Sequence, residues 1–120
     1  MAVILKGVGK RKAQILVCED ETDLREIIID IVKQALPNST IFEASEGHTA
    51  LNMAMSSHFD LIITDIMMPH VDGQSLIRSL TRLPAGLSPK RIIVISATVT
   101  AHKQENINKV IVDFFPKPIA

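Results

Sequence analysis

Short apolar runs alternate with amphipathic stretches from Gln14 onward, and this alternation is the feature that most limits what the chain can fold into. Five of the runs have the length and the β-branched residues of strands. They are QILVC (14–18), TIFEA (40–44), DLIIT (60–64), RIIVIS (91–96) and VIVDFF (110–115). Because the segments LII and IIVI are continuous rather than alternating, we expect strands that are buried on both faces.

The stretches between these runs are predicted to be helices. Apolar residues recur at intervals of three and four in residues 24–36, 50–55 and 76–83, as they do in amphipathic helices. Residues 100–109, TAHKQENINK, are polar and only weakly amphipathic, and we expect a further helix there. Strands that alternate with helices at this spacing indicate an α/β fold with a parallel sheet covered on both faces.

Length and composition indicate one small domain without a nucleic-acid or membrane surface. The chain has 120 residues, and its 13 basic side chains balance 13 acidic ones. This balance and an aromatic content of 3% argue against nucleic-acid binding, and no apolar run is long enough to span a bilayer. Cys18 is the only cysteine, which favours a cytoplasmic location. We interpret residues 1–12 as an N-terminal extension and residues 13–120 as the domain.

Polar side chains lie at the carboxyl ends of four predicted strands. Glu19 and Asp20 follow the first, Asp65 the third and Lys117 the fifth, while Ser96 ends the fourth. In a parallel sheet these ends meet at one edge, which is where ligands bind. Neighbouring carboxylates repel one another unless a cation lies among them, and Mg²⁺ prefers oxygen ligands and often works with phosphate. The pattern predicts a Mg²⁺ site at which Asp65 is a nucleophile that accepts a phosphoryl group.

Four motifs in the chain resemble those of response-regulator receiver domains, the phosphoacceptor modules of two-component signalling. They are ILVCEDE, DLIITDIMMPHVDG, IIVISA and FFPKP, and the resemblance covers residues 14–119. It implies a flavodoxin-like, doubly wound sheet of five parallel strands in the order 2-1-3-4-5. It also implies a switch rather than an enzyme, which takes its phosphoryl group from a sensor histidine kinase or a histidine phosphotransfer protein and binds a downstream protein target.

The resemblance implies how the site binds Mg²⁺. Asp65 matches the phosphoacceptor aspartate, which is also a metal ligand, and Asp20 matches the acid that contacts the ion directly. Glu19 matches its neighbour, which often acts through water, and the backbone carbonyl of Met67 matches the third protein ligand. Asp is commoner than Glu at position 19, but a water-bridged contact tolerates the longer side chain. We therefore expect Mg²⁺ binding to be kept.

Further matches concern the switch itself. Ser96 matches the Ser or Thr that bonds the phosphoryl group, Lys117 the lysine of the site, and Phe114 the aromatic residue that changes rotamer on activation. Pro118 matches the proline that follows a cis peptide bond. Phe114 lacks the hydroxyl of the Tyr often found there, which removes one hydrogen bond from the switched state.

The largest departure from the family pattern is at the C-terminus, because the family's fifth helix would follow Ala120. Without that helix, roughly 400 Å² of apolar surface on one face of the sheet would be exposed, at an upper cost of about 10 kcal/mol. Another element should therefore cover this face. The candidates are a second copy, the extension that carries Val3-Ile4-Leu5, or a part of a longer chain, and we favour self-association as a homodimer.

Two other functions stay open from the sequence. A phosphatase of the haloacid-dehalogenase type also uses an aspartate at a strand end, but it requires a second Asp two positions later, where Met67 stands. A docking or dimerisation module that no longer accepts phosphate is expected to have lost Asp65, Lys117 or the acid pair, and all are present. Because the apolar Met67 side chain cannot orient a water molecule, we also expect slow self-dephosphorylation.

Overall fold

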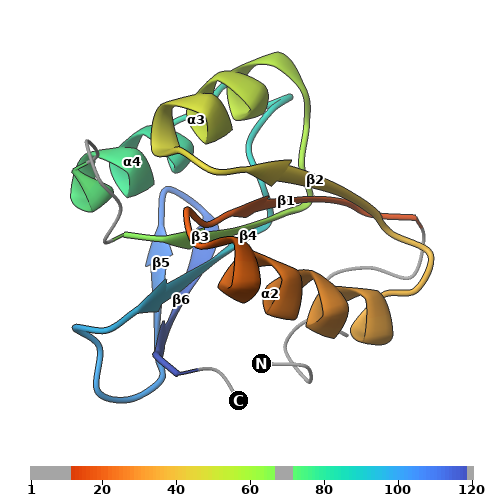
Figure 1. Cartoon of the computed structure of the whole chain (residues 1–120). Helices are drawn as coiled ribbons and strands as arrows, with labels where there is room; N and C mark the ends of the chain where they lie inside the picture. The colour runs from red at the N-terminus through yellow and green to blue at the C-terminus, as the bar shows by residue number, and fades with distance from the viewer. Residues whose placement is uncertain (1–11, 67–71, 119–120) are drawn as a thin grey trace.

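The computed structural model describes residues 12–66 and 72–118, which form a six-stranded sheet with helices on both faces (Figure 1). The strand order is β2-β1-β3-β4-β6-β5. The strands are β1 (Gln14–Cys18), β2 (Thr40–Ala44), β3 (Leu61–Asp65), β4 (Arg91–Ser96), β5 (Lys103–Ile107) and β6 (Val110–Pro116). The helices are α2 (Thr22–Ala35), α3 (Gly47–Ser56) and α4 (Gly73–Leu80).

Two apolar clusters hold the layers together. Helices α3 and α4 cover one face of the sheet, and α2 covers the other (Figure 1). On the α2 face, Ile28 and Val32 pack with Ile15 and Ile63 of the central strands. Every residue of β3 is buried, which confirms the expectation drawn from its continuous apolar run. In the described ranges, no helix is both long and apolar enough to cross a membrane.

Parallel pairing brings the carboxyl ends of the central strands to one edge. Cys18 is in register with Thr64, and Asp65 is in register with Ile95. The last pair of β4 and β6 joins Ser96 to Pro116, immediately before Lys117. The convergence of strand ends that the sequence predicted is therefore present, and the order of the five parallel strands is the predicted one.

The helix predicted for residues 100–109 is wrong, because this segment contains strand β5, which pairs antiparallel with β6. The two strands are joined through Asn108 and Lys109, which have φ of 51° and 69°. Positive φ at both central residues is what a two-residue hairpin turn of type I′ requires, and Asn tolerates it well. The segment has too few apolar residues at helical spacing for a helix to pack against the sheet. It therefore forms a hairpin with β6 instead.

The face of the sheet opposite α3 and α4 is buried at the residues of β4 that point to it. Ile93 and Ile95 of β4 point to this face and are only 0% and 1% exposed. The burial of these two residues does not test the expected self-association, which stays a prediction. The extension with Val3-Ile4-Leu5, one of the covers considered, lies outside the described residues.

A buried carboxylate on the same face was not singled out from the sequence. Asp113 of β6 is 0% exposed and in register with Ile93. Its Oδ1 accepts a hydrogen bond from Gln104 Nε2 at 2.8 Å and lies 2.9 Å from His102 Nε2, while Oδ2 lies 3.3 Å from Arg91 Nε. Because buried charges need such partners, Asp113 ties β5 and the loop before it to the sheet.

Candidate functional site

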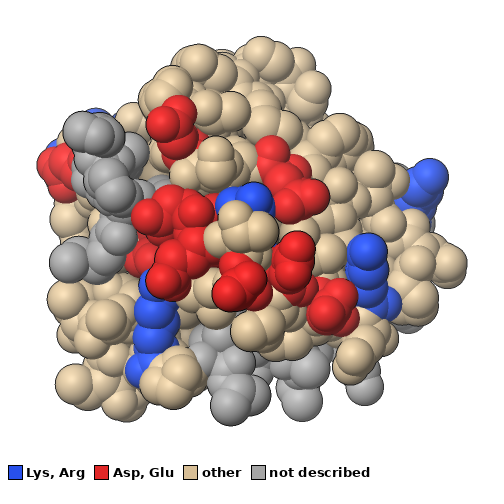
Figure 2. All heavy atoms as spheres, in the orientation of Figure 1, with Lys and Arg blue, Asp and Glu red and all other residues tan. Residues whose placement is uncertain are grey.

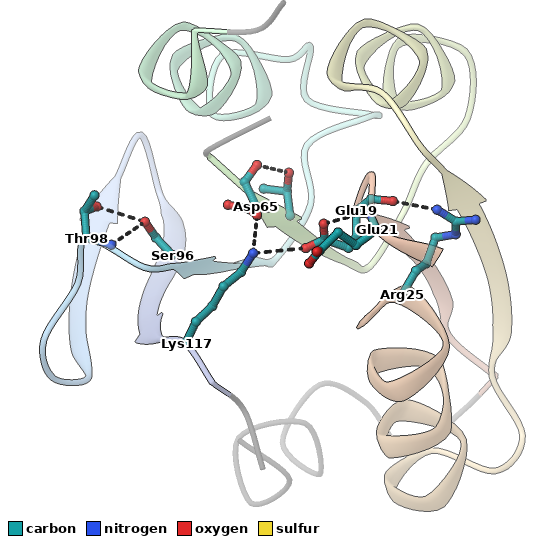
Figure 3. A network of polar contacts seen from close by, with 8 residues as sticks. Glu19, Glu21, Arg25, Asp65, Ser96, Thr98 and Lys117 are labelled. Carbon is teal, nitrogen blue, oxygen red and sulfur yellow. Dashed lines mark hydrogen bonds and ion pairs between the residues drawn. The ribbon is translucent and has the colours of Figure 1, made fainter. Parts of the chain in front are cut away.

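Four predicted site residues meet at the carboxyl edge of the sheet. Figure 3 shows the Lys117 ammonium group in contact with two carboxylates. Glu19 directly follows β1, and Asp65 is the last residue of β3. Glu19 and Asp65 are 0% and 2% exposed, whereas Asp20 beside them is exposed. A buried acid pair with an exposed third acid is an arrangement that could hold a cation.

The three carboxylates are close enough to share one ion. One oxygen from each of Glu19, Asp20 and Asp65 lies within 4.8 Å of the other two. Glu19 Oε1 is buried and makes no hydrogen bond among the described residues, although the Lys117 ammonium lies 3.6 Å away. A buried oxygen with spare lone pairs and a hard oxygen donor set fit Mg²⁺ better than they fit a softer metal.

Burial makes the ionised form of Glu19 costly. It raises the pKa of the carboxyl group from 4.5 to about 7, and the hydrogen bond with Asp20 and the charge of Asp65 act in the same direction. The backbone N–H of Glu21, which donates to Glu19 Oε2 at 3.1 Å, and the Lys117 charge oppose the rise. A bound cation would relieve this cost, so ion binding is coupled to the charge of Glu19.

Lys117 is held against the candidate phosphoacceptor. Its Nζ donates a hydrogen bond to Asp65 Oδ2 at 2.5 Å. Burial alone would lower the pKa of Lys117, but the hydrogen bond and the charges of Asp65 and Glu19 outweigh burial and raise the pKa. The lysine therefore presents a fixed positive charge at the carboxylate. The peptide bond from Lys117 to Pro118 is cis, as the resemblance implied.

Ser96 lies at the same edge but bonds within its own loop. Its Oγ is 2.9 Å from Thr98 Oγ1 and accepts a hydrogen bond from the Thr98 backbone N–H at 3.2 Å (Figure 3). Its backbone carbonyl accepts from the Lys117 N–H at 3.1 Å. Ser96 is thus placed next to the site by its strand, while its hydroxyl is engaged with Thr98.

Arg25 is a site neighbour that the sequence analysis missed. Its Nη1 donates to the Glu19 backbone carbonyl at 2.7 Å (Figure 3), and its Nε donates to Glu43 Oε1 at 3.0 Å. The guanidinium therefore links the loop after β1 to the end of β2 and fixes the backbone that carries the acid pair. The available signal was its position as the one basic residue in the acidic stretch EDETDLRE.

Acidic side chains dominate the surface around the site. Figure 2 shows Asp and Glu gathered on the face turned toward the viewer, where Figure 1 places the end of β1 and the start of α2. The chain as a whole carries equal numbers of acidic and basic residues, so this face and the remaining surface differ in charge. A binding partner or ion that approaches this face meets a negative potential.

Phe114, which the resemblance matches to the switch aromatic, is buried beside a hollow. Phe114 is 7% exposed, and Lys103 Nζ lies 5.0 Å from the centre of its ring. A hollow of about 370 Å³, lined partly by Ile66, Thr98 and Phe114, lies beside it. Met67, with its predicted carbonyl ligand and its predicted effect on phosphoryl lifetime, lies outside the described residues.

Comparison with known sequences identifies relatives of the chain. The family described as "Response regulator receiver domain" matches residues 15–120. A probable transcriptional regulatory protein of Picosynechococcus is 39% identical over 93 residues, which cover 72% of this chain and 35% of that protein. The chain thus spans about a third of the length of this relative.

Solved structures agree with the fold. A CheY-like receiver domain from Methylobacillus flagellatus superposes with a TM-score of 0.72 at 20% identity, covering 92% of this chain and 90% of that one. TrrA of Thermotoga maritima matches in its complex with the histidine kinase ThkA (TM-score 0.69, 23% identity, 90% and 88% covered). It also matches as wild-type protein with Mg²⁺-BeF (TM-score 0.59, 29% identity, 71% and 70% covered). The predicted flavodoxin-like α/β fold is confirmed, with one additional edge strand.

Proposed function

Because the chain belongs to the family of response regulator receiver domains, we propose that Asp65 accepts a phosphoryl group from a phosphohistidine and that the acyl phosphate changes a protein-binding surface. The observation that carries this proposal is the hydrogen bond from Lys117 Nζ to Asp65 Oδ2, at a buried strand end beside two further acids. An ammonium group in this position can stabilise negative charge on the phosphoryl oxygens during transfer.

The proposed transfer forms one bond and breaks one. A carboxylate oxygen of Asp65 attacks phosphorus, and the bond from phosphorus to the donor's imidazole nitrogen breaks, its electron pair returning to the ring. Lys117 holds Asp65 Oδ2 and so fixes the orientation of the carboxylate during the attack. The buried walls of β3 and β4 restrict water around the reacting group.

Glu19, Asp20 and Asp65 would hold Mg²⁺, together with the backbone carbonyl of Met67. Support comes from the mutual distance of the three carboxylates and from the buried Glu19 oxygen that makes no hydrogen bond among the described residues. When bound, the ion would offset the charge of the phosphoryl oxygens, as Lys117 does from its own side. Arg25 would act through Glu19 by fixing the loop backbone.

The switch would start at Ser96. A phosphoryl group on Asp65 offers its hydroxyl a charged acceptor, which forms a stronger hydrogen bond than the neutral Thr98 hydroxyl. Turning toward the phosphoryl group would break the contacts with Thr98 and move the loop of residues 97–102. That loop lines the hollow beside Phe114, so its movement gives the ring room to change rotamer.

The partners follow from this chemistry. A sensor histidine kinase or a histidine phosphotransfer protein would supply the phosphoryl group in the cytoplasm, and the complex of TrrA with a histidine kinase supports that class of partner. The signal would leave by binding of a downstream protein to the rearranged loop and its neighbouring strands. Two discrete conformations within a few kcal/mol of each other are enough for one phosphoryl group to shift the balance.

Titration with beryllofluoride and Mg²⁺, followed by NMR of the backbone amides, tests the proposal. Saturable shifts are expected at Ser96, Thr98 and Lys117, because the fluoride stands in for the phosphoryl oxygens beside Asp65. Asp65→Asn should abolish them, and Asp23→Asn, which removes an exposed acid of α2, should keep them. Equal binding by Asp65→Asn and the unchanged chain would overturn the assignment of Asp65.

A further inference from the structure

Strand β5 (Lys103–Ile107) ends the sheet and pairs only with β6 among the residues that the structure describes. Figure 1 shows this strand at the margin of the sheet, in a hairpin with β6. Its first four residues are exposed and its last is partly buried. The outer side of an edge strand presents backbone N–H and C=O groups to which another strand can add. We call this side the β5 edge.

The β5 edge is held in an extended conformation before any partner arrives. Gln104 Nε2 donates to the buried Asp113 carboxylate at 2.8 Å, and Lys103 Nζ lies 5.0 Å from the centre of the Phe114 ring. Side chains alternate along a strand, so Lys103 and Glu105 share one face of the sheet and Gln104 lies on the other. Because the strand is already ordered, pairing costs little conformational entropy.

We propose that the β5 edges of two copies pair antiparallel about a two-fold axis at Gln104, which joins the two sheets into one. The axis of such a pair is perpendicular to the sheet, so the same face of both copies points the same way. Directly opposite residues must then lie on the same face. In every allowed register the two-fold axis therefore passes beside one residue, and this residue pairs with the same residue of the second copy.

Charge selects one register from this small set. Centred on Gln104, the pairing sets Lys103 opposite Glu105 twice, once on each side of the axis. Centring on Lys103 or on Glu105 sets like charges against each other at the axis itself. Within β5, the Gln104 register is the one that places opposite charges directly across from each other.

In this register the side-chain amides of the two Gln104 residues can hydrogen-bond to each other. The Gln104 side chain donates one N–H to Asp113 and retains a carbonyl oxygen and a second N–H for the facing Gln104. The charge pattern of the strand is its own complement, which an unrelated strand would match only by coincidence. The contact is short, so the dimer belongs to the class of weak, concentration-dependent interfaces.

Charge reversal tests the register by sedimentation at protein concentrations up to about 1 mM, the range in which weak dimers form. Lys103→Glu and Glu105→Lys each turn both cross-strand pairs from attraction to repulsion, and each should raise the dimer dissociation constant about 30-fold. An equal mixture of the two variants sets opposite charges against each other again and should dimerise like the unchanged chain. Recovery in the mixture also shows that both variants are folded.

Two results would overturn the proposal: a chain that stays monomeric at the highest concentration, or variants whose mixture does not associate. Lys90→Glu, an exposed reversal outside β5, is the matched control and should leave the dimer unchanged. If the β5 edge instead binds a strand of some other protein, the chain alone should stay monomeric at the highest concentration. Sedimentation of the unchanged chain and of the mixed variants is done without phosphate. A negative result would therefore overturn the dimer and leave the phosphoryl-transfer proposal unaffected.

Cysteine cross-linking checks the axis independently. Gln104→Cys should give a disulfide-linked dimer on mild oxidation, because the two copies of this position face each other. Asn106→Cys should not, since its two copies would lie about 13 Å apart along the strands. The native Cys18 is buried in β1 and does not compete. Cross-linking of Asn106→Cys alone, or of both variants equally, would contradict the Gln104 register.

Discussion

Replacing Glu19 by Gln should make the metal-free protein more stable at neutral pH, although it removes a proposed Mg²⁺ ligand. Burial, together with the hydrogen bond with Asp20 and the charge of Asp65, raises the pKa of Glu19 from 4.5 to about 7. The folded protein then binds a proton more tightly than the unfolded chain, so the free energy of unfolding falls as pH rises through this interval and stays lower above it. The difference between the two pKa values corresponds to about 3 kcal/mol. Gln cannot ionise, so Glu19→Gln escapes this loss.

The assay is urea unfolding followed by far-ultraviolet circular dichroism, without Mg²⁺, from pH 5 to pH 8. The advantage of Glu19→Gln over the unchanged chain should grow by about 2 kcal/mol across this range, since the unfolded chain is already partly ionised at pH 5. Glu21→Gln removes an exposed acid of the same loop and is the control. A difference that does not change with pH would refute the account of a buried, costly carboxylate.

Mg²⁺ should narrow the difference in stability between the two proteins. An ion bound at Glu19, Asp20 and Asp65 stabilises the folded state by an amount that grows with the logarithm of its concentration divided by its Kd, and it favours the ionised form of Glu19. Saturating Mg²⁺ at pH 8 should therefore raise the unfolding free energy of the unchanged chain more than that of Glu19→Gln. Equal stabilisation of both would show that Glu19 does not contribute to the ion site.

Three further predictions follow from other parts of the molecule. Asp113→Asn should lower the unfolding free energy by about 2 to 3 kcal/mol in urea, because Arg91 loses its ionised partner and β5 its anchor, and unchanged stability would contradict this role. Ser96→Ala should still bind beryllofluoride but lose the amide shifts of residues 97–102, and retention of those shifts would show that the hydroxyl does not drive the loop. Met67→Asn should shorten the half-life of the phosphorylated protein, measured by intact mass, and an unchanged half-life would remove the proposed link to water orientation.

The central sheet and its site were predictable because they depend on simple regularities of the chain. Continuous apolar runs identify strands buried on both faces, and parallel pairing puts their carboxyl ends at one edge. Those two rules were enough to bring Glu19, Asp65 and Lys117 together, as the structure does. The Ser96 position followed from the same rule, but its bond to Thr98 depends on a side-chain rotamer that no sequence pattern specifies.

The β5 hairpin could not be predicted in the same way. KQENI has no apolar period that favours either helix or strand, and its conformation depends on partners far along the chain. One of these partners is Asp113, which accepts a hydrogen bond from Gln104. Its position as an isolated acid within the apolar run VIVDFF was a sequence signal that the prediction did not use. Its contacts with Arg91 and His102 come from two other segments, so they became visible only in the folded chain.

Self-association was expected from the sequence for a different reason from the one proposed here. The expectation rested on cover for the sheet face on which Ile93 and Ile95 are buried, and it stays untested. The β5 edge instead offers pairing through backbone groups and complementary charges. Sedimentation of the charge-reversal variants separates these two accounts, because only pairing at the β5 edge depends on Lys103 and Glu105.

The measurement that tests the central claim most directly is the intact mass of the protein after incubation with acetyl phosphate and Mg²⁺. The unchanged chain should gain a single phosphoryl group, and Asp65→Asn should gain none, while Asp23→Asn gains one like the unchanged chain. This result would establish Asp65 as the acceptor. A phosphoryl group on Asp65→Asn, or none on the unchanged chain, would contradict the account of the site.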